Sequence, residues 1–117
     1  MRVIGLGLNA SADRAAVQAA LAAAGPADLL AVLAARADHP ALEAPGLPLM
    51  ALPEAALAGI ATPTQSPRIM ARFGCGSVAE ACAIIASGGG ITHMRQTLGA
   101  VTWAVAEGPG PQKGSAG

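Results

Sequence analysis

The sequence FGCGSVAEACAIIASGGG, residues 73–90, carries the clearest local pattern in this chain. Its first glycines allow a tight bend, because glycine has no Cβ to restrict φ. Ser77 begins an S-x-x-E capping box, in which the serine hydroxyl accepts from the amide of Glu80 and the glutamate carboxylate accepts from the amide of Ser77. Apolar residues then recur at helical spacing, and glycines 88–90 end the helix. A glycine loop that enters a helix N-terminus favours a carboxylate or a phosphate, although a purely structural connection has the same pattern.

Strand and helix patterns alternate in the first half of the chain. Residues 2–8 are almost all apolar, which is typical of a strand buried on both faces. Ser11 is predicted to cap a helix over 12–24, which Gly25 and Pro26 end. The further predicted elements are strands over 29–35 and 48–52, a helical turn over 40–44 capped by Asp38 or His39, and a short helix from Pro53 to about Gly59.

Two further patterns follow in the second half. A hairpin is predicted from 91–96 and 100–106, because the second of these segments alternates valine, tryptophan and valine on one face. A serine followed by a proline is a typical helix start. One such helix is predicted from Ser66 and Pro67 to Phe73, with Arg68 and Arg72 on one side.

The order of these elements predicts an α/β fold. We expect a single domain over residues 1–106, with helices packed on a mixed five-stranded sheet. The first three strands are expected to be parallel and the last two to form the hairpin. Residues 107–117 are rich in glycine and proline and are predicted to be a disordered tail.

Charge and hydropathy limit the classes of function. Seven basic and seven acidic residues cancel, so neither nucleic acid nor a membrane surface is an expected partner. The charge is uneven, however: residues 1–59 carry three arginines and five acids, and residues 60–106 carry three arginines and one acid. The second half is therefore the side expected to meet an anion. No apolar run is long enough to span a membrane.

The two cysteines indicate a reducing compartment. Cys75 lies in the glycine loop and Cys82 on the predicted buried face, so no disulfide between them is expected, and a cytoplasmic location follows. His39 and His93 are far apart in sequence, so they form no obvious metal site with these thiols, and no cofactor is expected.

The end of the first strand resembles a dinucleotide fingerprint. Residues 5–10 read G-x-G-x-x-A and precede a helix. The fingerprint also requires an acidic residue at the end of the next strand. Asp28 comes before that strand and Asp38 well after it, so a nucleotide- or phosphate-binding module is only an alternative.

Four segments occur together in an order that resembles a known family. They are the glycine-rich residues 5–9, Thr-Pro-Thr-Gln-Ser at 62–66, Gly-Ser-Val-Ala-Glu-Ala at 76–81 and Val-Thr-Trp-Ala-Val-Ala at 101–106. This set resembles the cobalamin-biosynthesis family CobE, which is similar to the C-terminal domain of CbiG, the enzyme that opens the lactone of a cobalt-precorrin. The resemblance covers residues 1–106 and implies a role on the corrin pathway, in its oxygen-dependent route when the domain stands alone.

This sequence departs from the family pattern in two places. Residues 7–11 lack the basic residues that family members carry after the first strand, and Arg95 stands where the family tends to have a lysine. Arg95 keeps the positive charge at that position.

The expected ligand is a corrin or precorrin intermediate, which is a flat apolar macrocycle with carboxylates on its rim. Alanine and valine suit the ring, whereas helix N-termini and arginines suit the carboxylates. The predicted site lies where the loops over 8–11, 61–66 and 74–77 meet Arg95. The predicted ligand-binding residues are Asn9, Ser11, Thr62, Thr64, Ser66, Arg68, Gly76, Ser77 and Arg95.

Three functions are compatible with these patterns. We favour an accessory protein that binds a corrin intermediate, with other enzymes of the cobalamin pathway as further partners and a homodimer as a compatible state. A small hydrolase acting on a precorrin lactone is the second, with Glu80 as the candidate catalytic group and Cys75 and His93 as further candidates. The nucleotide- or phosphate-binding module is the third.

Overall fold

A computed structural model of the chain describes residues 1–43 and 46–110, and its centre is a five-stranded mixed sheet. The strand order is β3-β2-β1-β5-β4. The parallel strands are β1 (Arg2–Leu8), β2 (Leu29–Leu33) and β3 (Leu49–Leu52), and β5 (Val101–Glu107) pairs antiparallel with β1 and with β4 (Gly90–Leu98). The predicted fold class, with three parallel strands and a C-terminal hairpin, is confirmed.

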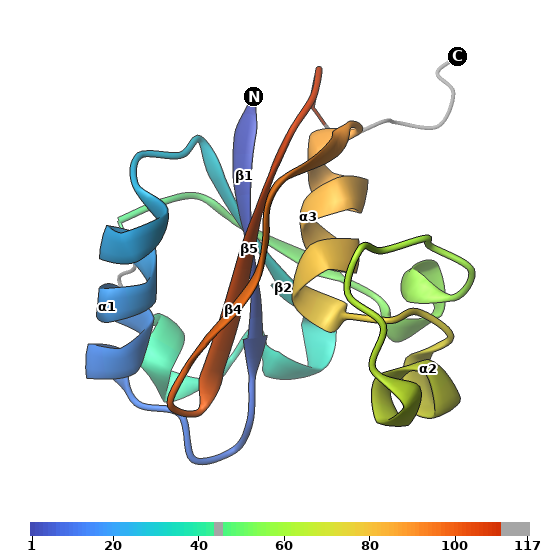
Figure 1. Ribbon diagram of the computed structural model, residues 1–117. Helices are drawn as coiled ribbons and strands as arrows, with labels where there is room; N and C mark the ends of the chain where they lie inside the picture. Colours follow the sequence, from blue (N-terminus) through green and yellow to red (C-terminus); the bar gives the residue numbers. More distant parts are fainter. Residues whose placement is uncertain (44–45, 111–117) are drawn as a thin grey trace.

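Helices cover both faces of the sheet (Figure 1). Helix α1 (Arg14–Ala24) lies on one face and α3 (Val78–Ser87) on the other, with α2 (Pro67–Phe73) beside the start of α3. The segments that connect them include three short 3-10 helices, η1 (Ala34–Arg36), η2 (Pro40–Leu42) and η3 (Glu54–Leu57).

The two faces are packed differently. Large side chains such as Ile4, Leu6 and Trp103 fill the face under α1. The face under α3 is built from smaller groups, and a Cβ at Gly5 would lie only 2.0 Å from the carbonyl oxygen of Ala79. Glycine at this position therefore lets α3 lie directly on β1.

Two of the predicted helix starts are confirmed. Ser66 caps α2, with Pro67 as its first residue, and the hydroxyl oxygen of Ser77 accepts from the amide of Glu80 at 3.3 Å. Gly74 and Gly88 end the two helices with φ of 78° and 70°, which is the left-handed conformation that glycine adopts without strain.

The predicted start of α1 is wrong by two residues. The helix begins at Arg14, and the carboxylate of Asp13 caps it by accepting from the amide of Ala16 at 2.8 Å. Ser11 is not a cap, because its hydroxyl donates to the side-chain oxygen of Asn9 at 2.7 Å. In the next turn, His39 is the cap, as predicted, since its Nδ1 accepts from the amide of residue 41.

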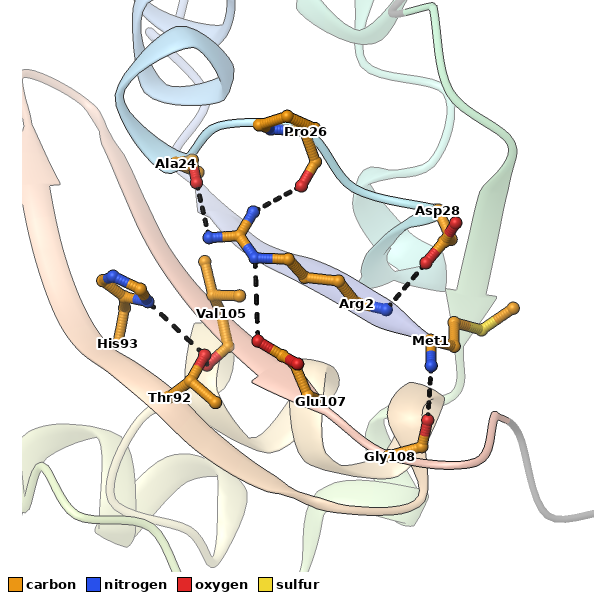
Figure 2. Close-up of polar contacts among 10 residues, drawn as sticks. All are labelled: Met1, Arg2, Ala24, Pro26, Asp28, Thr92, His93, Val105, Glu107 and Gly108. Carbon is orange, nitrogen blue, oxygen red and sulfur yellow. Dashed lines mark hydrogen bonds and ion pairs between the residues drawn. The ribbon is translucent and has the colours of Figure 1, made fainter.

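Arg2 connects three segments at the end of the sheet where β1 begins (Figure 2). The guanidinium of Arg2 donates to the carbonyl oxygens of Ala24, at 2.7 Å, and of Pro26, and it pairs with Glu107 at 3.9 Å. The backbone amide of Arg2 donates to the carboxylate of Asp28 at 2.8 Å. Arg2 thus satisfies the carbonyl of Ala24, the last residue of α1, which has no partner within the helix, and a carbonyl of the loop that follows.

The segment predicted to be a tail begins inside the sheet. Glu107 is the last residue of β5, the amide of Gly108 donates to the carbonyl of Met1 at 3.1 Å, and that of Gly110 donates to the carbonyl of Ser87 at 2.7 Å. Residues 107–110 are therefore held by the fold, and 111–117 lie outside the described residues.

Candidate functional site

A cavity of about 640 Å³ lies at the end of the sheet where β1 and β2 finish. The start of α3 covers Gly5, and beyond this point Gly7 and Thr102 line the cavity. Gly99 and Ala100, at the tip of the β4–β5 hairpin, and residues of α2 complete the lining. The apolar residues of its lining are Leu6, Leu8, Leu33, Ala35, Ile69, Phe73, Val78 and Ala100. Open α/β sheets bind ligands at this end of their parallel strands, and ligand cavities are commonly of this size.

Four of the six arginines in the chain line this cavity. Arg36 comes from η1, Arg68 and Arg72 from α2, and Arg95 from β4, whereas Glu54 is the one acidic residue of the lining. Such an excess of positive charge on an apolar wall favours an anionic ligand with an apolar body.

Only one of these four arginines has a protein partner for its side chain in the described parts of the chain. Arg72 pairs with Glu54 at 3.5 Å and lies over the ring of Phe73, 4.9 Å from its centroid. The guanidinium groups of the other three, Arg36, Arg68 and Arg95, make no hydrogen bond or ion pair within residues 1–43 and 46–110.

The structure brings four of the predicted ligand-binding residues together. Asn9, Arg68, Ser77 and Arg95 come from four different segments and all line the cavity. Ser11 is exposed outside the lining, where it bonds to Asn9.

The other predicted residues lie behind the cavity wall. The hydroxyl of Thr62 donates to the carbonyl of Thr64 at 2.8 Å, and that of Thr64 donates to the carboxylate of Glu80 at 2.7 Å, so both hydroxyl protons are used within the protein. A Cβ at Gly76 would lie 2.2 Å from the carbonyl oxygen of Thr64, and Ser66 caps α2. These residues therefore pack the loop over 62–66 against the start of α3.

Only half of the predicted capping box forms. Glu80 is fully buried, and its carboxylate accepts from the amide of Thr64 at 2.8 Å, the hydroxyl of Thr64 at 2.7 Å and the amide of Arg95 at 2.7 Å. The expected bond to the amide of Ser77 is absent from these contacts, because the loop and β4 supply three donors instead. Glu80 does not line the cavity, so it is not placed to act on a ligand there.

The two other candidates for chemistry are also outside the cavity lining. Burial raises the pKa of the Cys75 thiol, and burial together with the neighbouring Cys75 raises the pKa of Cys82 to about 12, so both thiols are neutral at pH 7. A neutral buried thiol is a poor nucleophile. His93 is exposed on β4, where its Nδ1 lies 3.4 Å from the hydroxyl of Thr92 (Figure 2).

Sequence reasoning missed Arg36 and Glu54 as lining residues and did not select Arg72. The signal for Arg36 was its place directly after a parallel strand, where side chains meet at the ligand-binding edge. Arg72 shares one side of α2 with Arg68, so the pair was available from helical spacing.

The glycine pattern over 5–10 has a packing role in this fold. Gly5 lies under α3, and the N-terminus of α1 is already occupied by the carboxylate of Asp13. A phosphate at that helix start would meet this negative charge. Among the described residues, no three His, Cys, Asp or Glu gather as a metal site would require. In the same residues no single helix could cross a membrane, and only α2 and α3 taken together, bent by 57°, reach that length and composition.

The fold and this cavity define a small α/β domain with an arginine-lined cavity at the ends of its parallel strands. The sequence matches the family model described as cobalamin synthesis G C-terminus over residues 2–106, so the chain belongs to this family. It is a protein of the cobalamin biosynthesis pathway, similar to CobE and to the C-terminal domain of CbiG.

Two solved structures share the fold. CobE, a protein from the cobalamin (vitamin B12) biosynthetic pathway, is 23% identical with a TM-score of 0.69, and the alignment covers 91% of this chain and 89% of that chain. The cobalamin biosynthesis protein chiG from Agrobacterium tumefaciens str. C58 is 25% identical with a TM-score of 0.68, and the alignment covers 93% and 99%. No curated protein matches the chain. The resemblance drawn from the sequence is confirmed.

Proposed function

We propose that this protein binds a carboxylate-rich corrin or precorrin intermediate in the cavity at the ends of β1 and β2. The observation that carries the proposal is that three guanidinium groups, those of Arg36, Arg68 and Arg95, face this cavity without a protein partner in the described residues. An arginine binds a carboxylate through two parallel N–H···O bonds, and unpartnered arginines around one cavity suit a ligand with several carboxylates.

The apolar wall supports the same class of ligand. The leucines at the strand ends and Val78 at the start of α3 offer apolar surface for the ring, and Arg68 and Arg95 line the same cavity. The N-terminus of α3, at Ser77, adds the positive end of a helix dipole. A macrocycle with acetate and propionate groups fits both features, whereas a simple phosphate would use only the charges.

Binding without independent chemistry is the form of this function that we favour. A hydrolase needs a base or a nucleophile within reach of its substrate. Glu80, Cys75 and His93 all lie outside the cavity lining, and the first two are fully buried. The protein would then hold an intermediate and pass it to another enzyme of the pathway. Two free, buried thiols support a cytoplasmic location as part of this proposal.

Titration with coloured tetrapyrroles tests the proposal. The purified protein is mixed with a panel of corrin intermediates and with uroporphyrin, which carries an acetate and a propionate on every pyrrole ring, and both the spectrum and the products are followed. We expect a saturable spectral shift without turnover. Coproporphyrin, in which methyl groups replace the acetates, should bind more weakly.

Variants locate the binding. Arg68→Ala should weaken binding roughly tenfold or more, the loss expected for one charged hydrogen-bonding partner. Arg14→Ala is the matched control, because Arg14 pairs with Glu43 on the surface and does not line the cavity. The proposal is refuted if no carboxylate-rich tetrapyrrole binds, or if Arg68→Ala binds as well as Arg14→Ala.

A further inference from the structure

Strand β4 changes its register next to the cavity. Between the pairs His93–Val105 and Gln96–Trp103, β4 advances by three residues while β5 advances by two. One extra residue in one strand is a β-bulge, which can turn a side chain toward the other face of a sheet.

The bulge decides the face on which Arg95 lies. Directly paired residues share a face, and Val105 and Trp103 both belong to the core under α1. His93 and Gln96 therefore both lie on the α1 face. In a regular strand every second residue shares a face, so Arg95, two residues after His93, would also lie on the α1 face. Because Arg95 directly precedes Gln96, the register after the bulge places it on the opposite face, under α3. Its place in the lining of the cavity, on the α3 side, agrees with the register after the bulge.

The buried carboxylate of Glu80 holds this bulge. The backbone amide of Arg95 donates to Oε2 of Glu80 at 2.7 Å, and the same oxygen accepts from the hydroxyl of Thr64 at 2.7 Å. The other oxygen accepts from the amide of Thr64 at 2.8 Å. One carboxylate thus connects α3, the loop over 62–66 and β4 behind the cavity wall.

We infer that Glu80 is a positioning residue, which sets the affinity of the cavity for a carboxylate by holding the β4 bulge that directs Arg95 into it. The ligand part of this inference rests on the proposed function. Glu80 itself is fully buried and touches no ligand in the cavity. Its effect on binding must therefore pass through Arg95, and this dependence distinguishes it from a residue that only stabilises the fold.

The first test needs no ligand. Amide hydrogen exchange is measured by NMR on the full chain, and the amide of Arg95 should exchange slowly because its acceptor is a buried carboxylate. Glu80→Met removes the acceptor and should speed exchange at Arg95 roughly tenfold or more. Thr64→Val is the matched control, since it removes one donor to the same carboxylate but leaves the amide of Arg95 its acceptor. Fast exchange at Arg95 in the parent, or unchanged exchange in Glu80→Met, would overturn the inference.

The second test is a double-mutant cycle with uroporphyrin as the probe. Glu80→Met should weaken binding roughly fivefold in the parent and have no effect in the Arg95→Ala background, because the residue through which it acts is then missing. Equal losses in both backgrounds would mean that Glu80 is only structural. If Glu80→Met does not fold, Glu80→Gln takes its place. The backbone amides of Thr64 and Arg95 bond to different carboxylate oxygens, and glutamine keeps only one oxygen for the two.

The two proposals fail separately. If the parent does not bind uroporphyrin or any corrin intermediate, the proposed function is overturned, and the exchange rates at Arg95 still decide whether Glu80 holds the bulge. If the parent binds and the cycle shows no dependence on Arg95, the proposed function stands and the role of Glu80 is overturned.

Discussion

The two ends of the sheet both carry arginines but use them in opposite ways. At the end where β1 begins, Arg2 uses its guanidinium on Ala24, Pro26 and Glu107 (Figure 2). At the opposite end, Arg36, Arg68 and Arg95 line a cavity, and their guanidinium groups have no partner among the described residues. The guanidinium at the first end is bonded within the protein, whereas the three at the second end are available to the ligand that we propose.

The difference separates an arginine whose guanidinium is bonded within the protein from one whose guanidinium has no protein partner among the described residues. The sequence does not show which guanidinium groups are bonded within the protein, because their partners are distant in the chain. Helix α3 sets the boundary between the two ends, because its first turn covers Gly5 and leaves Gly7 exposed to the cavity. The following variants change one end or the boundary and leave the other end intact.

The largest effect is expected at the boundary. Gly5→Ala would place a methyl group 2.0 Å from the carbonyl oxygen of Ala79, so α3 must move away from β1. We expect a loss of about 3 kcal/mol in the free energy of unfolding, measured by urea denaturation. Gly7→Ala is the control, because its methyl group meets only the side chain of Thr102 and should cost much less. Equal losses in the two variants would contradict this account of the boundary.

The next effect concerns the end of the sheet where β1 begins. Arg2→Ala removes two hydrogen bonds to carbonyl oxygens and one ion pair, and we expect a loss of about 2 kcal/mol in the free energy of unfolding. Binding of uroporphyrin should be unchanged, since Arg2 is at the other end of the sheet. Arg14→Ala, which removes only an exposed pair with Glu43, should cost less than about 1 kcal/mol. A loss of binding in Arg2→Ala would mean that the two ends are not independent.

A smaller effect is expected from the cap of α3 at the cavity. Ser77→Ala removes the acceptor for the amide of Glu80 and should lower the free energy of unfolding by about 1 kcal/mol. Ser77 also lines the cavity, so the same variant is titrated with uroporphyrin. We expect its affinity to stay within about twofold of the parent, because the hydroxyl already serves the helix. A larger loss would show that Ser77 also binds the ligand.

The smallest effect is expected from the one acid of the cavity. Glu54 pairs with Arg72 at 3.5 Å and therefore competes with a ligand carboxylate. Glu54→Gln should tighten binding of uroporphyrin about two- to threefold, since an exposed pair is worth less than about 1 kcal/mol. The expected gain should disappear in the Arg72→Ala background. Weaker binding in Glu54→Gln alone would show that Glu54 supports the site.

Most of the fold follows from local patterns in the sequence. The apolar run of β1, the Ser66–Pro67 start of α2 and the Ser77 cap of α3 each depend on residues within a few positions of one another. Such contacts are fixed by the geometry of one strand or one helical turn. The start of α1 is an exception, because serine and aspartate are both good N-caps and the sequence offers Ser11 and Asp13. The hydroxyl of Ser11 donates to the side chain of Asn9, so Asp13 caps the helix.

The candidate site follows from the sequence only in part. Loop positions before helices selected Asn9 and Ser77, the spacing of the predicted helix selected Arg68, and Arg95 was selected by its charge at the edge of the sheet; all four line the cavity. Spacing could not distinguish Thr64, whose hydroxyl faces Glu80, from a residue that faces the cavity. The direction of a loop side chain depends on what packs against the loop, and that information is not local.

The sequence by itself determined the strand and helix order, the family and the end of the sheet at which we propose a ligand site. Only the tertiary structure decided the partner of Glu80. Its carboxylate had a local partner in the amide of Ser77 but bonds to Thr64 and Arg95, which are 16 and 15 residues away. The reason is burial: a fully buried carboxylate must be satisfied by several donors at once, and only the loop and β4 bring enough of them together.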